Sequence, residues 1–221
     1  MSVSHHLDDA TVLRYAAGDL DEAFAIVVSS HLTMCDTCRN AVRAAEDMGG
    51  ELMERCEPTS VEPGSFDALM NRLATVNDDD AIRISGRVAR DPGSDVPAPL
   101  ARHVGKSLDG IAWKTIAPGV RKHDIALDTD GKSRLYMLSI GPGRAMPEHG
   151  HGGDEMTLIL SGAYRDEFGR FAAGDIADLD EHVEHEPVVE QDAPCICLVA
   201  TEAPTRFRGL LMRLLQPIFG V

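Results

Sequence analysis

The sequence predicts a multi-domain chain in which a small helical bundle precedes an all-β sandwich or barrel. Residues 7–77 follow the spacing of amphipathic helices, whereas from about Ile111 the apolar residues alternate with a period of two. The charge divides in the same way: residues 1–80 hold 16 acidic and 5 basic side chains, and residues 81–221 hold 20 and 16. The expected units are a helical domain over 1–80, a linker over 81–105 and a β domain over 106–221.

Four helices are expected in the first domain, because each has a recognisable start. The first is expected to end at Gly18, and the second is the apolar segment DEAFAIVVSSHL. The fourth, FDALMNRLATV, places Leu69, Met70 and Leu73 on one face. The residues expected to open the four helices are Asp8 or Asp9, Asp21, Asp36 or Thr37, and the Pro63-Gly64-Ser65 turn.

The second domain is predicted from short alternating strands that Gly and Pro residues separate. The expected strands are IAWKTIA, HDIALD, RLYMLSI, TLILSG, AYRDEF, IADL and CICLVAT. The segment before them, DPGSDVPAPL, has the composition of a linker. The C-terminal RGLLMRLLQPIFG is expected to form a docking helix or tail.

The net charge of -15 at pH 7 restricts the partners of the chain. It argues against direct binding to nucleic acid and against an anionic membrane surface, since both attract basic proteins. The first residues, MSVSHHLDDA, lack the basic start and apolar segment of a secretory signal, so we expect a cytoplasmic protein. Five cysteines, two of them in a Cys-x-x-Cys, then favour metal or redox chemistry over a disulfide framework.

A candidate zinc site is formed by His31, Cys35 and Cys38, in the order His-x3-Cys-x2-Cys. Thiolates and imidazoles are preferred zinc ligands, and a closed structural site has four of them. If one helix runs through this segment, the three residues share a face. The fourth ligand is expected from His5 or His6, so a metal would tie the N-terminal segment to the helix pair. The alternatives are two core cysteines beside an incidental histidine, and a redox Cys-x-x-Cys without the βαβ context that it needs.

A second candidate metal site lies in the segment GRAMPEHGHGGDEMTLILSG, which begins at Gly143. His149 and His151 are two residues apart on an expected strand and therefore point to the same side, and Glu155 follows a Gly-rich turn. Two imidazoles and a carboxylate suit a divalent transition metal. The fourth ligand is expected from a later strand, at His182 or His185.

The spacing of this segment matches the first motif of the cupin family, G-x5-H-x-H-x3-E-x6-G, at every fixed position. The resemblance implies a cupin β-barrel, also called a double-stranded β-helix. The second cupin motif, G-x5-P-x-G-x2-H-x3-N, is degenerate, because Ala172 and Ala177 stand where Pro and His are usual. The departure affects the fourth metal ligand and leaves the expected fold unchanged.

The two sites together, in this order, resemble the ChrR family of zinc-binding anti-sigma factors over nearly the whole chain. The resemblance implies a Zn²⁺ site formed by His6, His31, Cys35 and Cys38. It implies a cupin site for Zn²⁺ or another divalent transition metal, formed by His149, His151, Glu155 and His185. It further implies a transcriptional regulator, and not an enzyme. Its acidic N-terminal domain would sequester a group IV (extracytoplasmic-function) sigma factor, and its cupin would sense an oxidative-type stress such as singlet oxygen.

The alternative is a cupin metalloenzyme with a zinc-dependent accessory domain. Cupins with three His and one Glu include dioxygenases, decarboxylases and isomerases. The zinc-type module and its concentrated negative charge disfavour this alternative, because an enzyme needs neither. Cys195 and Cys197 share one strand face and are expected to be buried core thiols, with oxidation during sensing as the alternative role.

Overall fold

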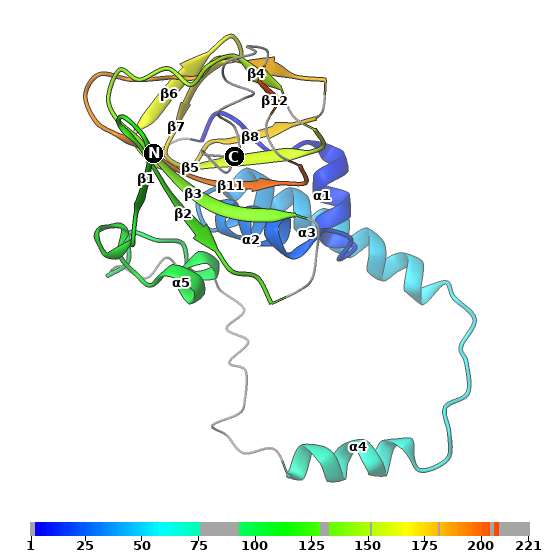
Figure 1. Cartoon of the computed structure of the whole chain (residues 1–221). Helices are drawn as coiled ribbons and strands as arrows, with labels where there is room; N and C mark the ends of the chain where they lie inside the picture. Colours follow the sequence, from blue (N-terminus) through cyan, green and yellow to red (C-terminus); the bar gives the residue numbers. More distant parts are fainter. Residues whose placement is uncertain are drawn as a thin grey trace.

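The computed structural model describes residues 3–75, 93–128, 133–150, 152–180, 182–203 and 206–207, and its helices precede its strands (Figure 1). The helices are α1 (Asp9–Ala16), α2 (Glu22–Leu32), α3 (Asp36–Glu54), α4 (Ser65–Ala74) and α5 (Ala98–Val104), followed by a 3-10 turn (Leu108–Gly110). This order confirms the predicted sequence of an N-terminal helical part and a β-rich part.

The strands form three sheets in which every pair is antiparallel. The six-stranded sheet has the order β1-β2-β3-β11-β5-β8, and the two three-stranded sheets have the orders β10-β6-β7 and β12-β4-β9. The bounds are β1 (Lys114–Ala117), β2 (Val120–Ile125), β3 (Arg134–Ile140), β4 (His149–Gly150), β5 (Glu155–Ser161), β6 (Ala163–Asp166), β7 (Gly169–Ala172), β8 (Ile176–Leu179), β9 (Glu184–His185), β10 (Val188–Val189), β11 (Cys195–Thr201) and β12 (Arg206–Phe207).

The first helix begins and ends, and the second helix begins, where the sequence predicts. The side chain of Asp8 accepts the backbone N–H of Thr11 at 2.8 Å and caps α1. The chain leaves α1 through Gly18 at φ +72°, a conformation that favours glycine. Asp21 is the N-cap of α2.

Two details of the helices differ from the sequence prediction. The cap of α3 is Cys35, one residue before the expected Asp36 or Thr37, and its Sγ accepts the Cys38 N–H at 3.4 Å. The helix α5 forms inside a segment whose composition indicates a linker, because Pro is well tolerated in the first turn of a helix.

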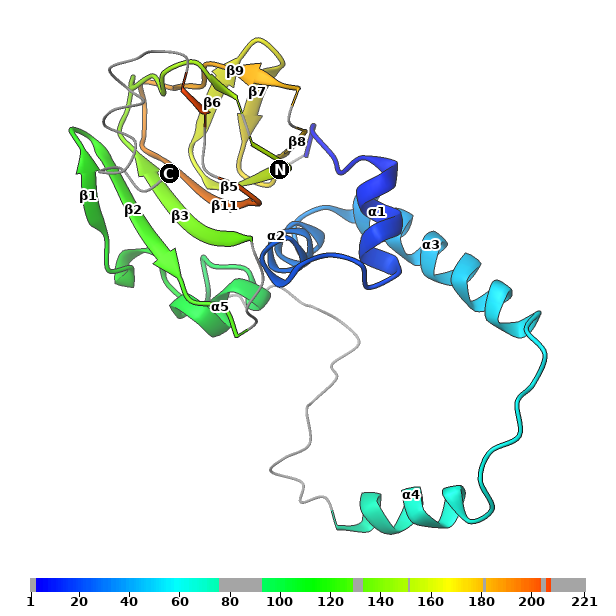
Figure 2. The same ribbon diagram turned by 45° about the vertical axis from the view of Figure 1, so that its right-hand side comes forward.

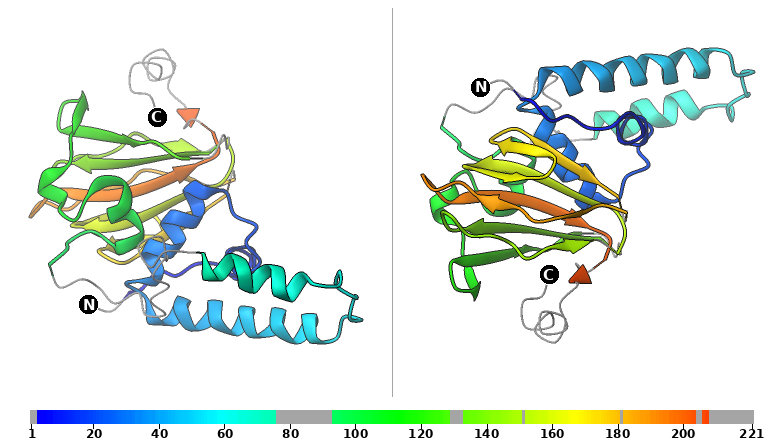
Figure 3. Two further views of the ribbon diagram at one scale, coloured as in Figure 1. Left: turned by 90° about the horizontal axis from the view of Figure 1, so that it is seen from below. Right: turned by 90° about the horizontal axis from the view of Figure 1, so that it is seen from above.

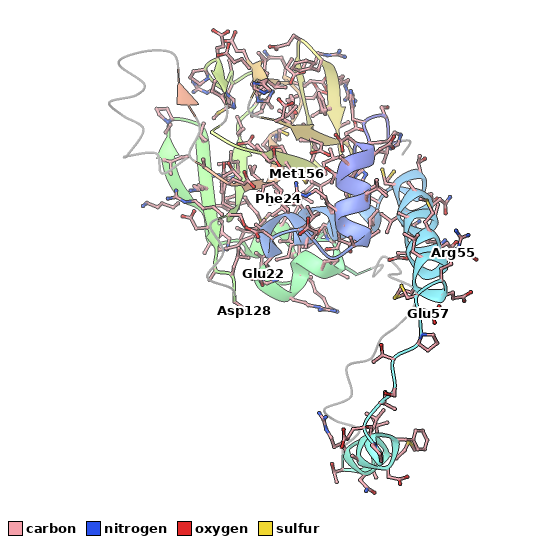
Figure 4. All side chains as sticks on the ribbon, turned by 90° about the vertical axis from the view of Figure 1, so that its right-hand side faces the viewer. Glu22, Phe24, Arg55, Glu57, Asp128 and Met156 are labelled. Carbon is pink, nitrogen blue, oxygen red and sulfur yellow. The ribbon has the colours of Figure 1, made fainter. Side chains whose placement is uncertain are left out.

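The helix α2 packs against the six-stranded sheet, so the helical and β-rich parts share one core (Figure 3). Phe24 of α2 and Met156 of β5, both labelled in Figure 4, belong to one buried cluster with Leu198 of β11. Strand β11 is buried on both faces, since Cys197 belongs to a second cluster together with Phe171 of β7. This burial explains the almost continuous apolar composition of CICLVAT.

The end of α3 and the whole of α4 extend away from this core (Figures 1 and 2). Among the residues of α3 only Cys38 and Val42 are buried, and α4 buries none of its side chains. The exposed apolar side chains on these two helices are Met48, Leu52 and Met53 of α3, and Phe66, Leu69, Met70 and Leu73 of α4.

No helix among the described residues has both the length and the apolar composition needed to cross a bilayer. The C-terminal segment RGLLMRLLQPIFG, predicted to be a docking helix or tail, lies outside the described residues. Residues 81–92 of the predicted linker also lie outside them.

Candidate metal centres

The first cluster forms where α2 ends and α3 begins. His31 lies in the last turn of α2, Cys35 caps α3 and Cys38 lies in the first turn of α3. His6, from the extended segment before α1, completes a group of four whose ligand atoms all lie within 4.8 Å of one another. The three residues do not share the face of one continuous helix. The chain turns between α2 and α3, and this turn brings the two thiols toward the imidazole of His31.

The hydrogen bond of His31 determines which of its nitrogens faces the cluster. Its Nδ1 lies 3.0 Å from the backbone oxygen of Gly174 and donates to it, because a carbonyl only accepts. Its Nε2 is buried and has no hydrogen-bond partner among the described residues. Burial lowers the pKa of His31 to about 4, although the bond to Gly174 opposes this shift, so the ring is neutral at pH 7. A neutral imidazole with a buried, unpartnered nitrogen fits a transition-metal ligand.

The two candidate N-terminal histidines have different surroundings. The Nδ1 of His6 lies 3.3 Å from the Sγ of Cys35 and 3.6 Å from the Sγ of Cys38. His5 points elsewhere: its ring stacks on Phe171 with centroids 3.9 Å apart. The structure therefore brings His6 to the cysteines, and His5 to the cupin-like domain.

The donor set of this cluster suits a tetrahedral metal. Cys35 and Cys38 are 1% and 2% exposed, and burial raises the pKa of Cys38 to about 11 in the metal-free chain. A bound cation would offset the cost of ionising such buried thiols. Two thiolates and two imidazoles form a closed four-ligand set of the kind that holds structural zinc.

The second cluster joins three strands of the β-rich part. His149 on β4 is paired with His185 on β9, and Glu155 begins β5. The ligand atoms of these three buried residues lie within 4.8 Å of one another. His151, the other predicted histidine of this site, lies outside the described residues. His182, the alternative to His185, is exposed and is not a member of the cluster.

Both histidines of the second cluster are oriented by bonds at Nδ1. In His149 this atom lies 2.8 Å from the backbone oxygen of Pro147, and in His185 it lies 3.0 Å from the Oδ2 of Asp166. Each ring is thus fixed by a bond on the side away from the ligand atoms, a common arrangement around metal-binding histidines. Asp166, whose side chain is 1% exposed, is a contributor that the sequence motif does not contain.

A cavity beside the second cluster is lined mainly by apolar side chains. Its walls include His149, His185, Tyr164, Cys195 and Cys197. Burial raises the pKa of Cys195 to about 12, and it raises the pKa of Cys197 as well, so both thiols are protonated at pH 7. Both cysteines are buried free thiols of the interior, as expected for core residues.

The chain is thus a two-part protein with two candidate metal sites: a helical unit with a His–Cys cluster precedes a β-rich domain with a His–Glu cluster. Comparison with known proteins identifies its family. The family profile of the ChrR cupin-like domain matches residues 102–204. The anti-sigma-E factor ChrR of Cereibacter sphaeroides is 44% identical over 221 residues, which is 100% of both chains. The crystal structure of Rhodobacter sphaeroides SigE in complex with the anti-sigma ChrR matches with 42% identity and a TM-score of 0.77, covering 90% of this chain and 99% of that one.

The chain belongs to the ChrR family. The match extends over both the helical part and the cupin-like part, so the chain shares both parts with this family. The alternative of a cupin metalloenzyme is not favoured by this relationship.

Proposed function

We propose that the chain is an anti-sigma factor that sequesters a group IV (extracytoplasmic-function) sigma factor with its N-terminal helices. The observation that carries this proposal is the unpartnered apolar surface of α3 and α4. A relative was solved in complex with SigE, and we therefore infer that the protein that covers this surface is a sigma factor.

The helix α4 has the pattern of a helix that binds a protein groove. Phe66, Leu69, Met70 and Leu73 follow the i, i+3, i+4, i+7 spacing of one face, and each of these residues is between 48% and 71% exposed. A helix of 10 residues is marginal in water on its own, since isolated helices shorter than about 12–15 residues rarely persist. A partner that covers this face would supply the missing packing energy.

The charge of the N-terminal part favours a basic partner. Residues 1–80 carry 16 acidic and 5 basic side chains. Sigma factors present basic surfaces to DNA, and an acidic partner would be steered toward such surfaces and could cover them. The chain would then control transcription without binding DNA, and it would act in the cytoplasm, where its partner is found.

The proposal assigns a structural Zn²⁺ to His6, His31, Cys35 and Cys38. When bound, this ion would crosslink the N-terminal segment to the α2–α3 junction and so hold the binding surface in shape. His149, His151, Glu155 and His185 would hold Zn²⁺ or another divalent transition metal in a cupin β-barrel. The proposed domain limits are 1–80 for the helical domain, 81–105 for the linker and 106–221 for the cupin. The cupin would sense an oxidative-type stress, such as singlet oxygen, and cause release of the sigma factor.

Co-purification tests the proposal directly. The tagged full chain is co-expressed with each group IV sigma factor of its own organism, and the bound protein and metal are quantified. We expect stoichiometric capture of one sigma factor. The double variant Leu69→Asp/Leu73→Asp should weaken binding by at least about 30-fold, equivalent to the loss of about 2 kcal/mol at an interface hot spot.

The matched control is Phe168→Asp, an exposed apolar residue of the cupin-like domain, which should bind the sigma factor like the unmodified chain. Capture of no group IV sigma factor by a correctly folded chain would contradict the proposal. Equal losses for the α4 variant and the Phe168 variant would contradict the assignment of the surface.

A further inference from the structure

We propose that the turn between β7 and β8 of the cupin-like domain positions the ligands of the N-terminal cluster, with Asp175 as the positioning residue. The inference rests on the metal binding proposed above for His6, His31 and the two cysteines. It means that the N-terminal site, whose four ligands all come from the helical part, is supported from the cupin-like domain.

The Asp175 carboxylate holds two segments that are about 170 positions apart in the sequence. Its Oδ1 accepts the backbone N–H of Ser4 at 2.6 Å and that of His5 at 3.0 Å. Its Oδ2 accepts the N–H of Ala172 at 2.8 Å, which closes the turn itself. The Asp175 side chain is 5% exposed, and its three bonds are partly buried. One carboxylate therefore fixes the residues immediately before His6.

The same turn orients the second histidine of the cluster. The Gly174 carbonyl, next to Asp175, accepts the Nδ1–H of His31 at 3.0 Å. Gly174 has φ +98°, and a Cβ atom there would lie 3.0 Å from the side chain of Val3. A close approach of the N-terminal segment to this turn thus depends on glycine. Two adjacent residues of one cupin turn therefore bond the imidazole of His31 and the backbone that leads into His6.

A stack of three rings connects this turn with the cavity of the second cluster. His5 stacks on Phe171 with centroids 3.9 Å apart, and Phe171 stacks on Tyr164 at 4.9 Å. Tyr164 lines the cavity together with His185. Direct ring contacts therefore run from Tyr164 in the cavity wall to His5, the residue that precedes His6.

A turn that only joins the two domains makes a different prediction from a turn that positions metal ligands. If the turn only joins the domains, loss of Asp175 lowers the melting temperature and leaves metal affinity unchanged. If the turn positions ligands, its loss weakens metal binding in a chain that is still folded. Removal of residues that orient metal ligands commonly costs about 10–100-fold in affinity.

The test is a Co²⁺ titration of the full chain against a competing chelator, read from the thiolate-to-cobalt absorption band. Asp175→Ala should weaken the affinity by about 10–100-fold. Asp175→Asn keeps one acceptor oxygen and should lose less. Glu190→Gln is the matched control, because Glu190 pairs with Arg165 and Arg170 and should leave the affinity unchanged.

His5→Ala provides a second variant, because it removes the ring from Phe171 while leaving the backbone bonds to Asp175 in place. If Asp175→Ala does not fold, reduced affinity in Asp175→Asn and His5→Ala still supports the inference. Unchanged affinity in all folded variants overturns it and leaves the proposed function intact. A wild-type band that is absent, or that survives the double variant Cys35→Ser/Cys38→Ser, overturns the N-terminal metal site and this inference together.

Discussion

At the scale of one residue, Asp178 is a carboxyl that folding buries close to the acidic side chains of Asp8 and Asp154. It lies on β8 and accepts the backbone N–H of Asp8 at 3.3 Å. Burial raises the pKa of Asp178, and the negative charges of Asp8 and Asp154 raise it further. The hydrogen bonds from Thr11 and Asp8 act in the opposite direction without cancelling the shift. The folded chain thus disfavours the ionised form of this carboxyl.

We predict that Asp178→Asn stabilises the folded chain at pH 7 by a few degrees in melting temperature. A carboxyl with a raised folded-state pKa contributes its stability below the unfolded pKa and loses it as pH rises through the folded pKa. The gain from Asn should therefore shrink as pH falls toward 4. Thermal unfolding between pH 4 and 8 measures this trend. Asp192→Asn, on an exposed site, should show no such trend, and a gain that grows on acidification would refute the assignment.

Spacing in the sequence identifies metal ligands only where the ligands lie close together along the chain. Cys35 and Cys38 could be recognised because three residues of one turn set their distance. The choice of His6 over His5 came from a family resemblance, since either residue could reach the cysteines. Asp175 could not be found, because its bonds join segments about 170 positions apart and no motif includes it.

At the scale of elements, capping residues predict helices well, while very short strands have no signal of their own. Asp8, Gly18 and Asp21 bound α1 and begin α2 as expected. Strands β4 and β9 contain two residues each and are defined only by their pairing with each other, His149 opposite His185 and Gly150 opposite Glu184. Such pairing is long-range, so the alternation of apolar residues cannot reveal it.

The helix α4 leads to a prediction about dynamics. None of its side chains is buried, so its hydrogen bonds are protected only by its own weak helical stability. We expect its amides to exchange within seconds in the free chain and to become protected by at least about tenfold when the sigma factor binds. Hydrogen exchange with mass spectrometry measures both states. The buried helix α2 is the internal control, and protection of α4 in the free chain would argue against an unpartnered helix.

At the scale of the molecule, metal removal should loosen the N-terminal segment, although the bonds from Asp175 to Ser4 and His5 remain. His6 is the one member of the first cluster that precedes α1, and it is exposed, so a bound ion would add a link to the cysteines beside the bonds that Asp175 makes to Ser4 and His5. We predict that a chelator increases proteolytic cleavage within residues 3–8 several-fold, while cleavage in β3 and β11 stays unchanged. Limited proteolysis with and without added Zn²⁺ measures this difference. Equal cleavage in both conditions would show that the ion does not hold the segment.

The shared core also predicts how the two parts unfold. Leu198 of β11 is 0% exposed and lies in the cluster that includes Phe24 and Val27 of α2, so a loss of packing there removes contacts of both parts. Leu198→Ala should lower the free energy of unfolding by about 2–5 kcal/mol. Because the contacts join the parts, the fluorescence of Trp113 in the β-rich part and the helical circular dichroism should shift to the same new midpoint. Leu69→Ala, on the exposed face of α4, should leave both midpoints in place. Two separate transitions, with only one of them shifted by Leu198→Ala, would mean that α2 rests on the sheet without stabilising it.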